Sequence, residues 1–216
     1  MMEKWSRYLW TSLIYFACFF EEYLSIGIIF LIFNGEFGVY QKCIHLLSIS
    51  VIWAISMIAI SRVSKKYIVF EEGTNKSNTI SIRSWIIVLL CLLGCKVMTF
   101  IDWHTLKVIG EWKNKELIYF LTQYIYYFFE IGLICSIISY GQRAFEVLLR
   151  QKSHIPFGGL ILAVTWGAMH FFSRGVIDTW NGISCMIFSV LSGIMYLKLN
   201  KNMKLSYIFI ALSYLL

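Results

Sequence analysis

The chain has 216 residues, of which 59% are hydrophobic, 18% aromatic and 14% charged, with a mean hydropathy of +0.70 and a formal net charge of +7. Soluble domains carry about 25% charged residues, so this composition excludes an ordinary soluble enzyme, a disordered chain and a disulfide-stapled secreted module. A single integral-membrane domain covering residues 1–216 fits the composition.

Seven long apolar runs divide the chain, and none alternates in polarity as a barrel strand would. Because only helices and closed barrels satisfy every backbone hydrogen bond in lipid, we expect an all-α, polytopic transmembrane helical bundle of about seven spans, within a range of six to eight. The expected segments are Tyr8–Phe33, Cys43–Ser61, Ser84–Ile101, Leu117–Tyr140, Gly158–Ser173, Thr179–Leu197 and Leu205–Leu216. The fifth and the last are short for a bilayer, which needs about 20 residues per helix.

The basic residues are distributed unequally between the two sides of this arrangement. Thirteen Lys and Arg residues fall on the side of the N-terminus and five on the other side. Since cytoplasmic loops carry the excess of Lys and Arg, we expect a multi-pass protein of the cell membrane with a cytoplasmic N-terminus. The positive charge then reflects topology and contact with anionic lipids of the bilayer, with no nucleic-acid partner.

Three glutamates and one lysine fall inside the apolar segments, where a charge is costly without a pocket or a partner. Glu21 and Glu22 are adjacent, so either the first helix breaks there or one carboxyl group turns toward lipid. Lys96 either pairs with one of them or extends toward the outer interface. Glu130 lies in the middle of the fourth segment, where a carboxyl group serves as a general base, a proton-relay member or a hydrogen-bonding group between helices.

Two short motifs in the C-terminal third combine charged, aromatic and imidazole groups. Glu146 and Arg150 are spaced i, i+4, so on a continuous helix they share one face, with Arg143 one turn earlier. Such a pair is either an ordinary surface ion pair or part of a site. Trp166 and His170 have the same spacing, so the indole is expected to flank the imidazole.

These motifs resemble those of the CAAX-protease and bacteriocin-self-immunity (CPBP) family of intramembrane proteases. That family carries Glu-Glu-x-x-x-Arg on one helix, an aromatic-x-x-x-His on the next and His-x-x-x-Asn or His-x-x-x-Asp on a late helix. Residues 145–150 lie on the first motif, residues 166–170 on the second, and residues 192–198 resemble the small-residue stretch that precedes the third. The resemblance covers residues 140–216 and implies the fold of the family. It also implies a mechanism in which a carboxylate deprotonates water while imidazole or amide groups hold the oxyanion.

The chain departs from the family pattern at three points. Phe145 stands where the family has its water-activating glutamate, no histidine follows His170, and the interval from Arg150 to His170 is shorter than usual for the family. A divergent or inactive member is therefore favoured over a competent protease.

The candidate catalytic residues follow from this comparison. They are Glu146, Arg150, His170, Glu130 and Asn181. Glu130 and Glu146 are the alternative bases, and Asn181 is the alternative amide donor. His170 is also the candidate ligand for a divalent metal such as zinc, although a catalytic zinc ion needs three protein ligands.

Three functions stay open at this point, and the oligomeric state stays open with them. The first is a hydrolase of a peptide or lipidated peptide, for which Glu146, Arg150 and His170 should converge on a wet cavity open toward the cytoplasm. The second is a non-catalytic relative that binds a peptide in bacteriocin immunity or regulation. The third is a small transporter component with a path along the intramembrane acidic residues, although the sequence has no inverted repeat.

Overall fold

The computed structural model describes residues 4–67, 79–173 and 175–216, and every regular element within these ranges is helical. The elements are α1 (Lys4–Ala17), η1 (Cys18–Phe20), α2 (Glu21–Ile32), α3 (Val39–Tyr67), α4 (Ile82–Trp103), α5 (Lys107–Asn114), α6 (Leu117–Leu148), α7 (Phe157–Leu162), η2 (Ala163–Gly167), α8 (Thr179–Lys198) and α9 (Met203–Leu215). The prediction of an all-α fold is confirmed.

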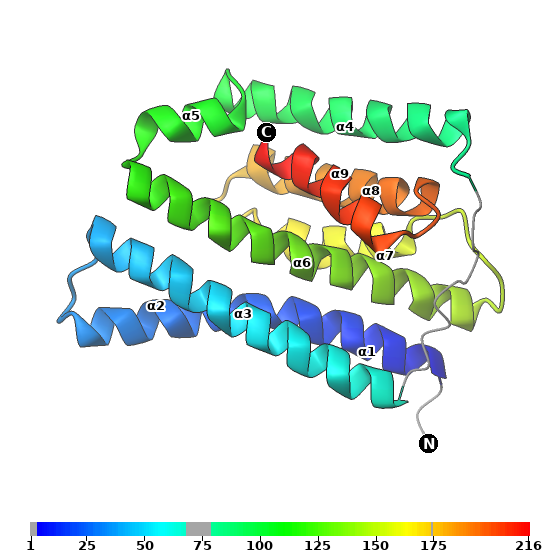
Figure 1. Cartoon of the computed structure of the whole chain (residues 1–216), viewed down its shortest axis with the longest axis horizontal. Coiled ribbons are helices and arrows are strands. Elements are labelled where there is room, and N and C mark those ends of the chain that lie inside the picture. Colours follow the sequence, from blue (N-terminus) through cyan, green and yellow to red (C-terminus); the bar gives the residue numbers. More distant parts are fainter. Residues whose placement is uncertain (1–3, 68–78, 174) are drawn as a thin grey trace.

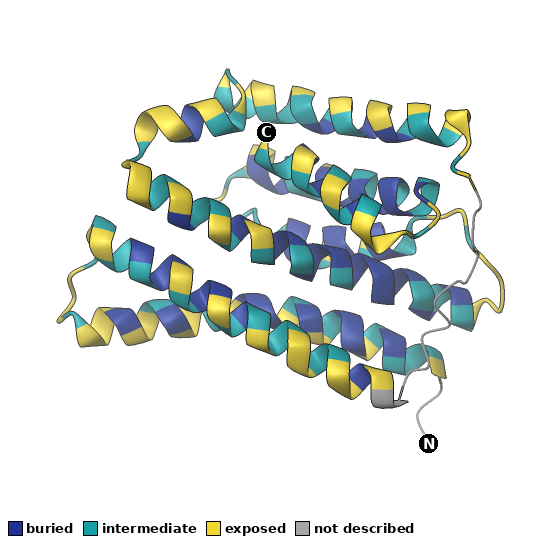
Figure 2. Ribbon diagram, viewed as in Figure 1, coloured by how far each residue is buried: buried dark blue, intermediate teal, exposed yellow. Residues whose placement is uncertain are grey.

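The longest helix, α6, runs through the middle of the bundle (Figure 1). Helices α1, α3, α7 and α9 pack against it, whereas α4 packs on α8 and α9. Ile131, Leu133, Ile134, Ile137 and Ile138 of α6 are fully buried, and the buried residues concentrate along this helix (Figure 2). A helix that is apolar around its whole circumference is typical of the centre of a bundle.

Within the described ranges, five helical stretches are long and apolar enough to cross a membrane, and these correspond to predicted segments one to four and six. Segments five and seven correspond to shorter apolar helices, Phe157–Gly167 and Met203–Leu215. All seven predicted segments are therefore helical, while the length criterion alone supports five spans.

The first predicted segment is interrupted next to Glu21 and Glu22. A helix break at this point was one of the two predicted alternatives. A 3₁₀ turn, η1, separates α1 from α2 and ends directly before Glu21. Glu21 accepts a hydrogen bond from Ser56 Oγ of α3 at 2.9 Å, and Glu22 accepts one from Tyr126 OH of α6 at 3.2 Å. Both carboxylates therefore contact neighbouring helices.

The predicted pairing of Lys96 with this acidic pair is wrong. Lys96 Nζ is buried, and it has no hydrogen-bond partner in the described part of the chain. The carboxylates are already satisfied locally, because Glu22 also lies 3.6 Å from His45 Nε2.

Glycines allow α7 to lie directly against both α6 and α8. A Cβ atom added at Gly158 would overlap the carbonyl group of Ile138 in α6. A Cβ atom at Gly159 would lie 2.7 Å from the carbonyl oxygen of Ser189 in α8. The close contacts of these two glycines fix the position of η2, which follows α7.

We predict that Gly158→Ala lowers the free energy of unfolding by about 1–3 kcal/mol, because the added methyl group must displace backbone atoms of α6. Gly27→Ala in α2 is the matched control, since a Cβ atom there meets nothing within 4 Å. Thermal unfolding of the two purified variants in detergent checks this. A Gly158→Ala protein as stable as Gly27→Ala would contradict the packing.

Candidate functional site

A cavity of about 240 Å³ lies among the C-terminal part of α4, α5, the start of α8 and the end of α9. Figure 1 shows α5 and the start of α1 at opposite ends of the bundle. The polar lining residues that matter below are Asp102, Lys107, Glu111, His170, Ser173 and Asn181, and the aromatic ones are Tyr127, Trp166, Phe188 and Tyr214. Charged groups and aromatic walls therefore share one cavity that is partly open to the surface.

The chain enters the cavity through a π-helical turn. Helix α7 continues into η2, and π turns concentrate at functional sites. Trp166 lies in η2, and its ring centroid is 4.2 Å from that of His170. His170 Nδ1 donates to the carbonyl oxygen of Trp166 at 2.8 Å, which places the lone pair of the neutral ring on Nε2. The predicted pairing of indole and imidazole is confirmed.

Asn181 holds the chain at His170 in position. Asp178 caps α8 by accepting from the backbone N–H of Asn181 at 2.9 Å. The Asn181 side-chain amide donates to the carbonyl oxygen of His170 at 2.9 Å and to Ser173 Oγ at 3.0 Å. Both amide hydrogens are used within the protein, so this group supports His170 instead of serving as an oxyanion donor.

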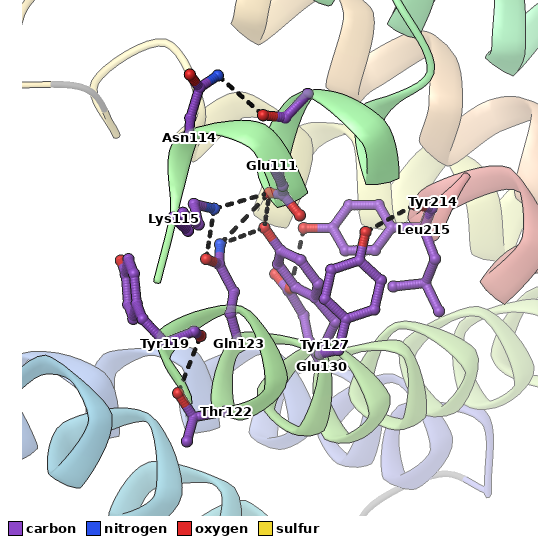
Figure 3. A network of polar contacts seen from close by, with 12 residues as sticks. Glu111, Asn114, Lys115, Tyr119, Thr122, Gln123, Tyr127, Glu130, Tyr214 and Leu215 are labelled. Atoms are coloured by element: carbon purple, nitrogen blue, oxygen red, sulfur yellow. Dashed lines mark hydrogen bonds and ion pairs between the residues drawn. The ribbon is translucent and has the colours of Figure 1, made fainter. Parts of the chain in front are cut away.

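Glu130 lies behind the cavity wall and connects three elements. The residue is 4% exposed. Its carboxylate accepts from Trp166 Nε1 at 3.2 Å. It also accepts from Tyr214 OH at 2.9 Å (Figure 3). The carboxylate therefore fixes the two aromatic side chains that form the cavity wall, one from η2 and one from α9.

A polar network from α5, which the sequence reasoning missed, completes the cavity (Figure 3). Glu111 Oε1 accepts from Tyr127 OH at 2.7 Å and lies 3.2 Å from Lys115 Nζ. Gln123 links the two, because it accepts from Lys115 Nζ at 2.5 Å and donates to Tyr127 OH at 2.5 Å. The signal that could have revealed α5 is the i, i+4 series Lys107, Glu111 and Lys115, which lies between the predicted third and fourth segments.

Glu146 belongs to a different region. Lys201 Nζ, in the turn between α8 and α9, lies 2.5 Å from Glu146 Oε1 and 2.7 Å from Oε2. The backbone N–H of Ser153 and the side-chain amide of Gln142 also donate to this carboxylate, at 3.2 Å and 3.3 Å. Three donors from three segments therefore make four hydrogen bonds to a side chain that is 3% exposed.

The predicted pairing of Glu146 with Arg150 is wrong. Helix α6 ends at Leu148, and Arg150 is exposed with φ 54°, so the two residues no longer share a helix face. The predicted convergence of Glu146 and Arg150 on His170 is also wrong. Glu146 lies 16 residues beyond Glu130 on α6, which is about 24 Å along the axis. His170 neighbours Trp166, which bonds to Glu130.

The expectation of a zinc ion does not fit the side chains around His170. Among residues 4–67, 79–173 and 175–216, no group of three or more His, Cys, Asp or Glu side chains is placed to hold a metal ion. A catalytic zinc site needs three protein ligands, so His170 lacks the partners for one in this part of the chain.

No protein-family profile, curated protein or solved structure matches this chain. Membership of the CPBP family therefore stays a prediction from the motifs at residues 145–150 and 166–170.

We predict that Lys201→Met destabilises the protein by about 2–4 kcal/mol, because it leaves the buried Glu146 carboxylate without its ammonium partner. Breaking a fully buried ion pair costs about 3–5 kcal/mol, and we expect a somewhat smaller loss here because the lysine side chain is 31% exposed. Adding Glu146→Gln to Lys201→Met should restore part of the loss. Chemical unfolding of the two single variants and the double variant measures the coupling, with Arg150→Gln as the exposed control. Additive effects of the two substitutions would show that the ion pair does not hold this end of α6.

Proposed function

We propose that the chain is an integral membrane protein that binds a peptide in the cavity at His170 without cleaving it, as a divergent relative of the CPBP family. The observation that carries this proposal is the separation of Glu146 from His170. The groups that the family uses for hydrolysis are distributed between two regions, and Glu146 is not among the residues that line the cavity at His170.

Membrane insertion is supported by the outward faces of the long helices. Leu24 is 69% exposed, Leu31 78% and Ile55 61%, and each lies within a helix long enough to cross a bilayer. Soluble monomers rarely expose apolar surface on this scale. With the N-terminus in the cytoplasm, the cavity faces the outer side, opposite to the opening that a cytoplasmic hydrolase would need.

Binding without cleavage is supported by the way each candidate catalytic group is used. Glu146 is neutralised by Lys201, and Phe145 occupies the position of the family's base. Asn181 donates both amide hydrogens to neighbouring protein groups. What the cavity retains are recognition groups, namely charges and aromatic surfaces, which are typical of a ligand pocket.

One observation favours a second candidate function, hydrolysis with a different base. Glu111 and His170 line the same cavity, and Glu111 Oε2 has no hydrogen-bond partner among the described residues. A carboxylate and an imidazole beside one space are the groups that general-base activation of water requires. Peptide turnover that Glu111→Gln and His170→Ala both abolish would support this alternative.

We predict the orientation by cysteine accessibility. Lys113 in α5 and Lys204 in α9 are both exposed. The end of α5 contacts Gln123 near the start of α6, whereas the turn before α9 contacts Glu146 near the end of α6, so the two lysines lie at opposite ends of the bundle. In a Cys185→Ala background, a membrane-impermeant maleimide added to intact cells should label Lys113→Cys but not Lys204→Cys. The five other native cysteines are buried and should contribute little background. The reverse pattern would place the N-terminus outside, and equal labelling of both sites without permeabilisation would contradict insertion.

We predict that the protein in lipid nanodiscs enriches peptides from a mixture of unmodified di- to hexapeptides, and that mass spectrometry recovers them intact. Ser184 lines the cavity, so Ser184→Phe should fill it and weaken binding at least tenfold, while Ser184→Ala serves as the matched control. If neither wild type nor Ser184→Ala enriches any peptide, the binding function is wrong. Cleaved products that disappear in His170→Ala would favour the hydrolase instead.

A further inference from the structure

The short helix α5 supplies the cavity with two opposite charges. Lys107 and Glu111 are spaced i, i+4, so they lie on one helix face, and both line the cavity. Gly110 sits between them on the buried side, where a Cβ atom would lie 2.7 Å from the ring of Trp103. The close contact of Gly110 with α4 fixes this face of α5 toward the interior.

The ammonium group of Lys107 rests on aromatic rings without a carboxylate at contact distance. Nζ lies 4.0 Å from the ring centroid of Tyr214 and 4.3 Å from that of Tyr127. Within the described ranges, no carboxylate oxygen lies within ion-pair distance of this nitrogen. The rings stabilise the cation in part and leave its hydrogen atoms available to an acceptor in the cavity.

The carboxylate of Glu111 is half satisfied. Oε1 receives the hydroxyl of Tyr127 and the ammonium group of Lys115, whereas Oε2 has no hydrogen-bond partner among the residues that the structure describes. The residue is 1% exposed, so bulk water does not substitute for the missing donor. A buried carboxylate oxygen without a donor is unfavourable, and a ligand that brings an N–H group relieves the penalty.

Lys107 and Glu111 form no ion pair at contact distance, although their spacing permits one. The order of lysine before glutamate is the weaker i, i+4 arrangement, and Glu111 instead pairs with Lys115, which follows it. The cavity therefore presents an incompletely paired cation and an incompletely paired anion about one helical turn apart.

We propose that the ligand is a small zwitterion with a free amino group and a free carboxylate, namely an amino acid or a very short peptide with both ends unblocked. The amino group is received by Glu111 Oε2 and the carboxylate by Lys107 Nζ. A volume of about 240 Å³ is below the roughly 300–1,000 Å³ typical of pockets for drug-sized ligands, which favours a ligand of one or two residues. The aromatic walls suit an apolar side chain. This inference deepens the proposed function and depends on it, because it concerns which peptides the same cavity accepts.

The test uses the full chain in nanodiscs and four probes: dileucine, N-acetyl-dileucine, dileucine amide and N-acetyl-dileucine amide. Equilibrium dialysis should give the tightest binding for dileucine, with at least a tenfold loss when either end is blocked. In Glu111→Gln the loss caused by acetylation should disappear while the loss caused by amidation persists. In Lys107→Met the pattern should reverse. A purely structural role of either residue would weaken all four probes equally.

Even if a variant fails to fold, comparing the four probes on the wild-type protein tests whether the ligand needs both a free amino group and a free carboxylate. Equal binding of all four probes would overturn the zwitterion and leave the peptide-binding function in place. Binding of hexapeptides without measurable binding of dileucine would also overturn it. Absence of binding by any peptide would overturn both proposals together.

Discussion

A buried carboxylate in the middle of α6 determines how the bundle can close around its cavity. Glu130 needs hydrogen-bond donors, because its position is remote from water, and it finds them in Trp166 of η2 and Tyr214 of α9. Each donor comes from a helix too short to cross a bilayer at full thickness. The carboxylate therefore ties the two shortest apolar helices to the longest one, and its two donors become the cavity wall.

Hydropathy predicted the helices well because the physical rule behind it is local. An apolar run in lipid must satisfy its own backbone, so each of the seven predicted segments is helical. The break before Glu21 was predicted as one alternative for the same kind of reason, since adjacent helical residues diverge. The pairing of Trp166 with His170 was predicted correctly because the two residues are four positions apart, about one helical turn, so no distant part of the chain is involved.

The errors arose where a partner lies far away in the sequence or where a helix ends. Glu146 and Arg150 would have met on a continuous helix, but α6 stops at Leu148, and the partner of Glu146 is Lys201, which is 55 residues away. No spacing rule within one segment identifies such a partner. The contribution of α5 was missed because eight residues with three lysine or glutamate side chains look like a polar connection, and only the packing against α4 and α6 reveals their inward face.

The carboxylates near the two ends of α6 differ in how completely they are hydrogen-bonded. At Glu146 both carboxylate oxygens are satisfied, by ammonium, amide and backbone donors, so this end is closed and has nothing left to bind. Near Tyr127, one carboxylate oxygen of Glu111, Oε1, has two donors, whereas the other, Oε2, has none among the described residues. Selection for stability alone would favour pairing Lys107 with Glu111 or replacing both by apolar residues, since a half-satisfied buried network is worse than an apolar core. Retaining opposite, incompletely paired charges around a cavity is physically reasonable when an outside molecule completes them, which is the reason to look for function at this end of the protein.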